Sequence, residues 1–438
     1  MLEKIFKLKE NNTTAKTEII AGLTTFMTMA YIIALNPNLL TGFGKDTMPE
    51  LWNGVFLATC IASAIGTIVM AFLANKPFAM APGMGLNSFF AVVVTNIVAL
   101  TGMTYVASFQ SALCIVLIEG IVFLVLSVLN IREKIVDAIP LGVRLGIAPA
   151  IGLMLLNIGV GSNAGIYSEN GGPFYAMRDF FGALTPSLAK TNMGSGYSAM
   201  VLSVVTMFVG LFAIVVLAQR GVKGAVLLGM LISSIIYWAG EAIFLGTNPF
   251  ASLATASFVP AFGDMASTTL FKFDSIPSLA PTFMQFTHGF GELFNFSEGV
   301  GTSLLSVVSV LIALVLVDMF DTIGTLVGTA SRAGMLDKNG KMPNMKQALL
   351  SDAVGTVAGS LTGTSTVTTF VESASGVEAG GRTGLTALTT GIMFLACIFI
   401  APIAGIIPAA ATSSALIYVG VLMVAGLKNV DFDDICQS

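Results

Sequence analysis

The stretch GTSTVTTFVESASGVEAGGRT, residues 363–383, lies between two strongly apolar segments, which places it at membrane depth. It opens with β-branched and hydroxyl residues that favour extended backbone, and it continues with Glu372, small residues and Arg382. Irregular backbone at that depth persists only where protein buries it or where it lines a cavity. An extended piece that runs into a half-helix leaves free N–H groups near Glu372, as in the discontinuous helices of transporters. The alternative is a re-entrant or polar packing segment without a ligand.

The composition around this stretch is that of a polytopic membrane protein. Of 438 residues, 55% are hydrophobic and 10% are charged, whereas soluble domains carry about 25% charged residues. The mean hydropathy is +0.89. The single histidine, His288, argues against a histidine metal site, and the four cysteines show no paired spacing. No phosphate loop, metal cluster or nucleophile–base set occurs, so we expect no enzymatic activity, no cofactor or metal, and no nucleic-acid partner.

Apolar segments long enough to cross a bilayer, about 20 residues each, recur along the chain. They lie near 18–39, 53–74, 78–100, 107–130, 142–163, 199–219, 224–246, 302–329, 346–362, 364–381, 383–404 and 409–427. The first is long enough to remain as a span, so we expect no cleaved signal peptide. Of the 20 Lys and Arg residues, sixteen fall on the side of the N-terminus and four on the other. The positive-inside rule therefore predicts a multi-pass protein of the plasma or inner membrane with a cytoplasmic N-terminus.

The order of these spans predicts two inverted halves. Seven spans precede a long outer segment at 247–299 that has no spanning run, so the eighth span starts on the opposite side from the first. Only the third span of each half is interrupted by polar residues or by glycine and proline. A pair of interrupted spans at matching places is the best pointer from sequence to a transporter site. The second half holds five spans, so we expect its last part to be shortened by two.

The first interrupted segment, FAMAPGMGLNSFF at 78–90, carries a candidate ligand contact. Pro82, Gly83 and Gly85 break the helix, and Asn87 lies at the start of the half-helix that follows. An asparagine amide offers one acceptor and two donors, which suits a flat polar heterocycle. As structure alone, Asn87 is a helix N-cap, and the two roles are compatible.

The eighth span contains VLVDMFDTIGTLVG at 315–328, with Asp318 and Asp321 in an otherwise apolar run. Each carboxylate costs about 2.5–3.5 kcal/mol at a helix centre, so each needs a partner or a cavity. The spacing of three places both on roughly one face. Two such carboxylates do not both ionise easily without a cation or donors, which suits a proton-coupled site. The alternative is that one of them merely ties helices together.

Further polar side chains at membrane depth extend the candidate set. Asp352 lies near enough in sequence to residues 363–383 to brace that stretch by hydrogen bonds, whereas Glu119 is interpreted as a satisfied structural group. A polar stripe on the first span either faces the same cavity or packs against spans with small residues. Its members are Thr24, Thr25, Thr28 and Tyr31.

Four motifs in order resemble the AzgA-like adenine/guanine/hypoxanthine permeases of the xanthine/uracil permease (nucleobase–cation symporter) group. They are TTFMTMAYIIALNP (24–37), APGMGLNSFF (81–90), VDMFDTIGTLVG (317–328) and GTSTVTTFVESASGVEAGGRTG (363–384). The resemblance extends to about residue 435. It implies an all-α membrane protein with a uracil-permease-like 7+7 inverted repeat of 14 spans, of which about 12 are present, and with short extended segments in spans 3 and 10. It also implies a core domain, 1–135 with 300–405, and a gate domain, 136–299 with 406–438.

The resemblance further implies import of purine nucleobases by proton symport. Carried over by motif, Asp321 and Glu372 would contact the purine, and we expect Asn87, Thr369, Ser373 and Thr25 to complete the site. For proton coupling we expect Asp318, Asp321, Glu372 and Asp352. The expected partners are a purine nucleobase, a proton (with sodium as the alternative ion), the lipid bilayer and a second copy of the chain. The shortened gate predicts weak purine binding without accumulation.

Three other readings compete with this one. An anion transporter of the same architecture needs a cationic or uncharged site, against which the carboxylates argue. An intramembrane aspartyl protease, pairing Asp318 or Asp321 with Asp352, resembles its relatives in a GxGD motif that is absent here. An ion channel fits inverted halves with carboxylates at broken helices less well than alternating access does.

Overall fold

The computed structural model describes residues 2–42, 44–45, 47–129, 141–160, 197–254, 256–259, 263–265, 300–332, 334–335 and 342–429. The chain divides into two compact units. Unit 1 comprises Met1–Ile139 and Val259–Phe399, and unit 2 comprises Pro140–Phe258 and Ile400–Ser438. Most of the predicted outer segment at 247–299 lies outside the described residues.

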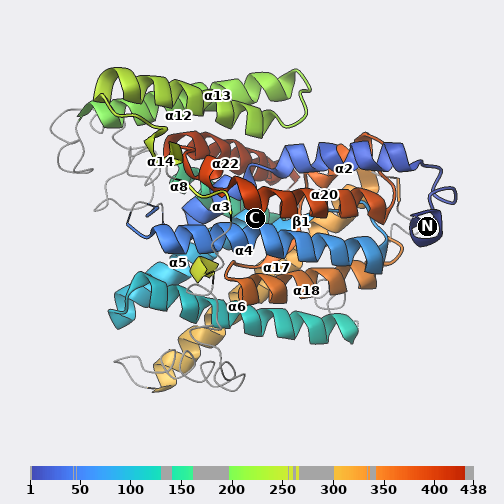
Figure 1. The fold of residues 1–438 in the computed structure, drawn as a ribbon. Coiled ribbons are helices and arrows are strands. Elements are labelled where there is room, and N and C mark those ends of the chain that lie inside the picture. The colour runs from blue at the N-terminus through green and yellow to red at the C-terminus, as the bar shows by residue number, and fades with distance from the viewer. Residues whose placement is uncertain are drawn as a thin grey trace. The chain divides into compact units, whose positions relative to one another are not determined.

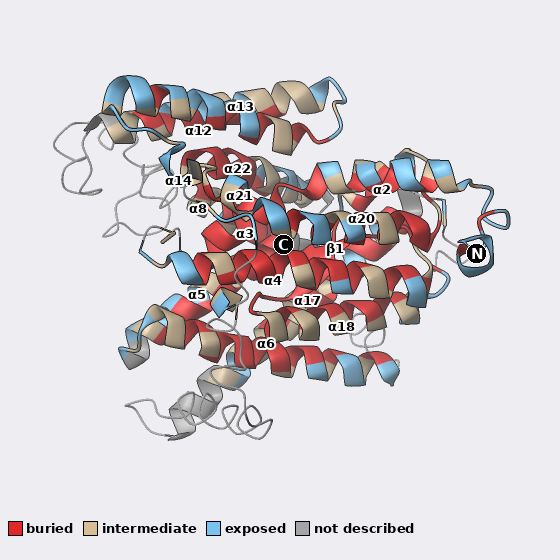
Figure 2. Ribbon diagram, viewed as in Figure 1, coloured by how far each residue is buried: buried red, intermediate tan, exposed pale blue. Residues whose placement is uncertain are grey.

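Unit 1 is a helical bundle built around a buried central helix. Its elements are α1 (Leu2–Phe6), α2 (Ala15–Met29), α3 (Ile32–Leu40), α4 (Pro49–Val69), η1 (Met70–Ala74), β1 (Met80–Pro82), α5 (Met84–Thr101), α6 (Tyr105–Val128), α17 (Val300–Arg332), α18 (Met345–Thr362), β2 (Val367–Thr369), α19 (Ser373–Glu378) and α20 (Gly384–Cys397). Helix α4 packs against α3, α18 and α20, and α2 runs beside α20 (Figure 1). Because neighbours surround it, α4 is buried along most of its length (Figure 2).

Unit 2 packs its helices through small residues. Its elements are α8 (Leu141–Val160), α12 (Tyr197–Gln219), α13 (Ala225–Gly240), η2 (Glu241–Leu245), α14 (Ala251–Ala254), α21 (Ala401–Gly405), α22 (Ala409–Val424) and η4 (Ala425–Asn429). Helix α22 packs against α8, α12 and α13. A Cβ added at Gly152 would lie 2.6 Å from the carbonyl oxygen of Gly420, so the two backbones approach closely only because both residues are glycine. Such contacts are typical of helix pairs in membranes.

The described helices follow the predicted spans. Eight candidate spans are long and apolar enough to cross a membrane, and Met84–Ala99 and Pro149–Val160 are shorter apolar helices. The first predicted span, 18–39, is confirmed as one candidate span, Ala15–Leu40, within which α2 and α3 are separated at Ala30 and Tyr31. The hydroxyl of Thr28 donates to the Thr25 carbonyl at 2.7 Å. Threonine bonds of this kind compete with the helical ladder and bend helices, which accounts for part of the break.

The two interrupted spans meet as a pair of antiparallel strands. Short extended segments were predicted in both spans, but their pairing was not. Strand β1 pairs with β2 in the register Met80↔Thr369, Ala81↔Thr368 and Pro82↔Val367. The ladder continues beyond both strands, because Gly83 N–H donates to Thr366 O at 3.1 Å and Phe370 N–H donates to Ala79 O at 3.0 Å. Chain segments almost 300 positions apart thus cross at one point inside unit 1.

Threonine side chains satisfy the outer edges of this two-stranded ladder. The Thr67 hydroxyl on α4 accepts from Met80 N–H at 2.9 Å and lies 3.0 Å from Met80 O. On the opposite edge, the Thr356 hydroxyl on α18 donates to Val367 O at 3.3 Å. Unpaired backbone groups are costly inside a membrane, and an open sheet edge there needs partners. These hydroxyls explain why irregular backbone persists between apolar helices.

Candidate functional site

A neutral network of buried amides and hydroxyls joins the two interrupted spans to α3 and α4. We call it the Asn87 cluster, and its members are Asn36, Thr59, Asn87, Thr364 and Ser365. The Asn36 amide donates to Thr59 Oγ1 at 2.7 Å and to Thr364 Oγ1 at 2.9 Å. The Asn87 amide donates to Asn36 Oδ1 at 2.6 Å, and the Ser365 hydroxyl donates to Asn87 Oδ1. All five residues are buried.

These bonds use the polar atoms of Asn87 within the protein. Asn87 Nδ2 also donates to the carbonyl oxygen of Pro82, with 3.2 Å between the nitrogen and the oxygen. Both hydrogens of Nδ2 therefore have protein partners. The expectation that Asn87 caps a helix is wrong, because the N-cap of α5 is Gly83 and Asn87 lies one turn inside the helix. Its predicted contact with a ligand stays a prediction, and the structure shows a bracing role beside it.

A second network contains carboxylates. We call it the acidic cluster, and its members are Asp318, Asp321, Thr322, Asp352 and Glu372. The Thr322 hydroxyl on α17 lies 3.2 Å from Asp318 Oδ1 and 3.0 Å from each carboxylate oxygen of Asp352 on α18. Asp318, Thr322 and Asp352 are fully buried. The same hydroxyl lies 2.8 Å from the hydroxyl of Thr368, so the acidic cluster is hydrogen-bonded to strand β2.

Asp321 and Glu372 lie on the side of the acidic cluster next to the crossing strands. Asp321 Oδ2 lies beside Gly83, 3.6 Å from where a Cβ on that glycine would be. Its carboxylate interacts electrostatically with those of Asp352 and Glu372. Glu372 is the N-cap of α19, and its side chain makes no capping hydrogen bond. Its carboxylate Oε1 instead accepts from the Tyr31 hydroxyl at 2.7 Å. The structure therefore brings together the four acids that the sequence singled out.

The three predicted hydroxyl contacts take different positions. Ser373 Oγ accepts from Ala79 N–H at 3.0 Å, which ties the start of α19 to the residue before β1. Thr25 faces α19, where its hydroxyl would touch a Cβ added at Gly376. The hydroxyls of Thr25 and Thr369 are both buried and have no hydrogen-bond partner among the residues that the structure describes. The Ser373 hydroxyl is thus hydrogen-bonded to the backbone. Thr369 lies on strand β2.

Glu119 has a protein partner in this region. Its Oε2 accepts from the Thr366 hydroxyl at 2.9 Å, so α6 is tied to the residue before β2. This acid therefore braces the second interrupted span directly, whereas Asp352 is linked to it through Thr322, whose hydroxyl lies 2.8 Å from that of Thr368. A carboxylate that accepts from a buried hydroxyl stabilises the segment that carries the hydroxyl.

Glu18 is a buried acid that the sequence reasoning missed. Its Oε1 accepts from Arg382 N–H at 2.9 Å, and its Oε2 accepts from the Thr386 hydroxyl at 2.6 Å and from the N–H groups of Thr383 and Thr386 at 3.2 Å. A carboxylate on α2 thus caps the start of α20. Arg382 Nη1 donates to Val377 O at 2.7 Å, at the end of α19. The sequence contained an indication of this role, because Glu18 is an acid at the first position of a predicted span.

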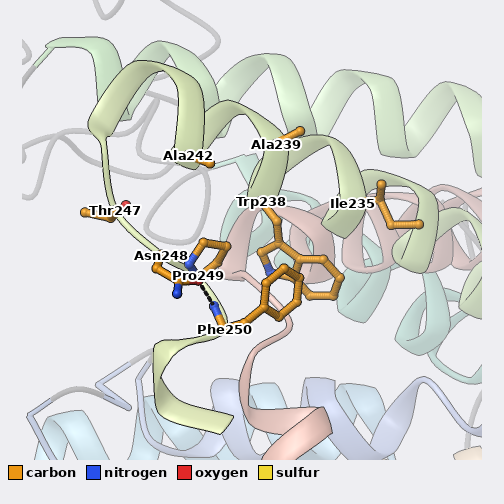
Figure 3. Close-up of a pocket in the computed structure, with 8 residues that line it drawn as sticks. All are labelled: Ile235, Trp238, Ala239, Ala242, Thr247, Asn248, Pro249 and Phe250. Carbon is orange, nitrogen blue, oxygen red and sulfur yellow. Dashed lines mark hydrogen bonds between the residues drawn. The ribbon is translucent and has the colours of Figure 1, made fainter. Parts of the chain in front are cut away.

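Unit 2 contains a pocket of a different character. It is lined by Ile235, Trp238, Ala239, Ala242, Thr247, Asn248, Pro249 and Phe250. Figure 3 shows the rings of Trp238 and Phe250 together at its edge, with centroids 5.1 Å apart. The indole N–H donates to Ile406 O at 3.0 Å, so the ring is fixed. None of the lining residues is ionisable, so this pocket does not share the chemistry of the acidic cluster.

Comparison with known proteins identifies relatives over the whole chain. The family model described as "Permease family" (Xan_ur_permease) matches residues 16–438. The adenine permease AdeP of Escherichia coli (strain K12) is 36% identical over 438 residues, which cover 100% of this chain and 83% of AdeP. The guanine/hypoxanthine permease PbuO of Bacillus subtilis (strain 168) is 36% identical over 436 residues, covering 99% of this chain and 87% of PbuO.

Solved structures share the fold at low sequence identity. The transmembrane domain of a cyanobacterium bicarbonate transporter, BicA, superposes with a TM-score of 0.65 at 16% identity, over 95% of this chain and 91% of that domain. An anion transporter, murine Slc26a9 in its inward-facing state, gives a TM-score of 0.57 at 11% identity, over 95% of this chain and 61% of that one. These likenesses show the predicted 7+7 inverted-repeat fold and carry no statement about substrate.

Proposed function

The chain belongs to the Xan_ur_permease family of permeases, and from that premise we propose that it imports purine nucleobases by proton symport. The observation that carries the proposal is the acidic cluster beside the crossing of β1 and β2. Two broken spans that meet next to buried acids are the arrangement in which transporters bind their substrates. The names of the relatives, an adenine permease for AdeP and a guanine/hypoxanthine permease for PbuO, point to the purine class.

Asp321 and Glu372 are the residues we propose to hold the purine. An ionised carboxylate accepts hydrogen bonds and cannot donate them. Adenine, guanine and hypoxanthine all present N–H groups at their edges, so carboxylate acceptors suit each of the three. Asp321 lies beside Gly83 at the end of β1, and Glu372 lies just beyond β2. A base between them would contact both interrupted spans at once.

Thr322 supports a proton as the coupling ion. A hydroxyl donates one hydrogen, yet the Thr322 hydroxyl lies within 3.2 Å of Asp318 and 3.0 Å of Asp352. When the Thr322 hydroxyl donates to one of these carboxylates, its hydrogen does not lie between Thr322 Oγ1 and the other carboxylate. That second contact is a hydrogen bond only if the carboxyl group carries the hydrogen. A proton on Asp318 or Asp352 supplies that second donor and reduces the repulsion between two buried charges. We therefore propose that this pair of acids takes up the symported proton and that Thr322 links it to β2.

The competing anion transporter is less well supported. Its fold is shared with BicA, but a likeness at 16% identity shows the fold alone. Buried carboxylates repel an anion, whereas they attract N–H groups and protons.

We also propose that unit 1 is the core domain, that unit 2 is the gate domain, and that the N-terminus is cytoplasmic in the plasma or inner membrane. A homodimer stays a prediction.

The test is uptake by the purified protein in liposomes. Radiolabelled adenine, guanine and hypoxanthine are offered separately, with the outside more acidic than the inside, with a sodium gradient alone, or with no gradient. In contrast to the expectation from the shortened gate, we propose that the chain accumulates at least one base under the proton gradient. Uptake should weaken as external pH rises and should stop after a protonophore is added. Accumulation that follows sodium and ignores pH would assign sodium as the coupling ion. Absence of purine binding by the wild-type protein would overturn the proposed function.

A further inference from the structure

One face of α2 contacts α19 along the whole length of that short helix. Near the middle of α19, a Cβ on Gly376 would lie 2.8 Å from Ala21 O, so the two helices touch through backbone. At its start, the Thr28 hydroxyl lies 3.4 Å from Glu372 O, and Tyr31 reaches the Glu372 side chain. Ala21 and Thr28, seven positions apart, share one face of α2, and Tyr31 follows as the N-cap of α3.

The contact at Tyr31 differs from the others because it reaches a carboxylate rather than backbone. The Tyr31 side chain is 1% exposed, and its hydroxyl donates to Glu372 Oε1 at 2.7 Å. A buried tyrosine ring has only two side-chain torsions, and packing against its neighbours fixes both. The hydrogen bond therefore fixes one oxygen of Glu372 in space, while the side chain of Glu372 makes no capping bond to α19.

We propose that Tyr31 is a positioning residue for Glu372, the carboxylate that contacts the base in the site proposed above. By holding Oε1, it orients Glu372 so that Oε2 is presented to an N–H group of the bound base. This inference rests on the purine site proposed above. A carboxylate that is already oriented loses less freedom when the ligand binds, and this lowers the cost of binding. The break between α2 and α3 at Ala30 and Tyr31 gives Tyr31 its place beside the start of α19.

The experiment compares Tyr31→Phe with a matched control, Tyr105→Phe. Each substitution removes one hydroxyl and keeps the ring. The Tyr105 hydroxyl donates to Leu40 O at 2.8 Å, which is a backbone contact outside the acidic cluster. Two quantities are measured on the full chain in detergent. They are hydrogen exchange of the backbone amides of α19 without ligand, and binding of radiolabelled hypoxanthine, guanine and adenine.

We expect Tyr31→Phe to speed amide exchange in residues 372–378 while the rest of unit 1 exchanges as in the wild type. We also expect the substitution to weaken purine binding about tenfold, because it removes one hydrogen bond to a charged group. In liposomes, KM for uptake should rise by a similar factor with kcat within about twofold, because the effect acts on binding. Tyr105→Phe should change neither exchange in α19 nor affinity.

Each outcome bears on the inference separately from the proposed function. Unchanged exchange in α19 and unchanged affinity in Tyr31→Phe would overturn the inference. Faster exchange throughout unit 1 with an equal loss in Tyr105→Phe would also overturn it, since a general structural role would then suffice. Local exchange that rises in Tyr31→Phe while the wild type binds no purine would support the positioning geometry and remove the proposed function.

Discussion

The Asn87 cluster and the acidic cluster flank the same pair of crossing strands but differ in chemistry. The Asn87 cluster consists of amides and hydroxyls, and both donors of the Asn87 amide have protein partners. The acidic cluster contains four carboxylates, and one hydroxyl, Thr322, lies within hydrogen-bond distance of two of them. All five residues of the Asn87 cluster are buried, whereas in the acidic cluster Asp318, Thr322 and Asp352 are buried and Asp321 and Glu372 are half-buried.

This difference indicates which of the two clusters changes its charge and hydrogen bonds when the pH changes or a ligand binds. A network of amides and hydroxyls keeps the same charge at any pH in the physiological range, so a change of pH leaves its hydrogen bonds in place. A network of close carboxylates changes its charge and its hydrogen bonds when a proton or an N–H group arrives. We therefore propose that the Asn87 cluster braces the fold and that the acidic cluster binds the base. The second interrupted span takes part in both, because Thr364 and Ser365 belong to the Asn87 cluster and Glu372 belongs to the acidic cluster.

The largest effect is expected for the acidic residues that we propose contact the base. Glu372→Gln and Asp321→Asn each replace an acceptor-only carboxylate by an amide that also presents a donor toward the ligand N–H. We expect purine uptake to fall more than about 100-fold, equivalent to about 2.7 kcal/mol or more. The thermal midpoint in detergent serves as the control and should stay within a few degrees of the wild type. Uptake near the wild-type rate in either variant would remove that residue from the site.

The next effect sharpens the distinction between binding and coupling inside the acidic cluster. Thr322→Val keeps the side-chain shape but removes the hydroxyl that lies between Asp318 and Asp352. Loss of a hydrogen bond to a buried carboxylate costs about 1.5–3 kcal/mol. We expect accumulation driven by a proton gradient to fall about tenfold or more, while exchange of labelled for unlabelled base falls less. Thr95→Val, which loses only a bond to Ala91 O in its own helix, is the matched control. Equal losses of accumulation and exchange would contradict a coupling role.

A third prediction tests whether the Asn87 cluster is structural. Asn87→Ala leaves the Asn36 amide oxygen and the Ser365 hydroxyl without their partner, at a cost of about 2–4 kcal/mol in stability. We expect a lower thermal midpoint in detergent. In the fraction that remains folded, purine affinity should stay within about threefold of the wild type. Loss of affinity comparable to that in Glu372→Gln, without loss of stability, would instead place Asn87 in contact with the ligand and break the comparison.

The smallest effect is expected at Thr25. Its hydroxyl is buried without a hydrogen-bond partner where α2 packs against α19. Thr25→Val removes that unsatisfied polar atom and keeps the shape, so we expect the free energy of unfolding to change by less than about 1 kcal/mol, in either direction. Uptake should stay within about twofold of the wild type. A tenfold loss of uptake at unchanged stability would show that the hydroxyl contacts the substrate, as the sequence suggested.

Much of the fold could be predicted from the sequence because membrane depth constrains it strongly. Apolar runs of about 20 residues mark helices, since every backbone group must be bonded within the segment. The stretch at 363–383 and the segment at 78–90 violated that pattern, and both became strands at the crossing. The separation of α2 and α3 at Ala30 and Tyr31 was not predicted, because the apolar run continues through it.

The sequence by itself determined the kind of protein, the two places where spans are broken and the acids that membrane depth makes costly. Those conclusions follow from composition and local pattern, which act over one helix. Only the tertiary structure decided which partner each acid meets. Thr322 lies between Asp318 and Asp352, Tyr31 holds Glu372 from 341 positions away, and Glu18 caps α20. Such pairs depend on how distant helices pack, and hydrogen bonds act over about 3 Å, a scale that spacing along the chain does not encode.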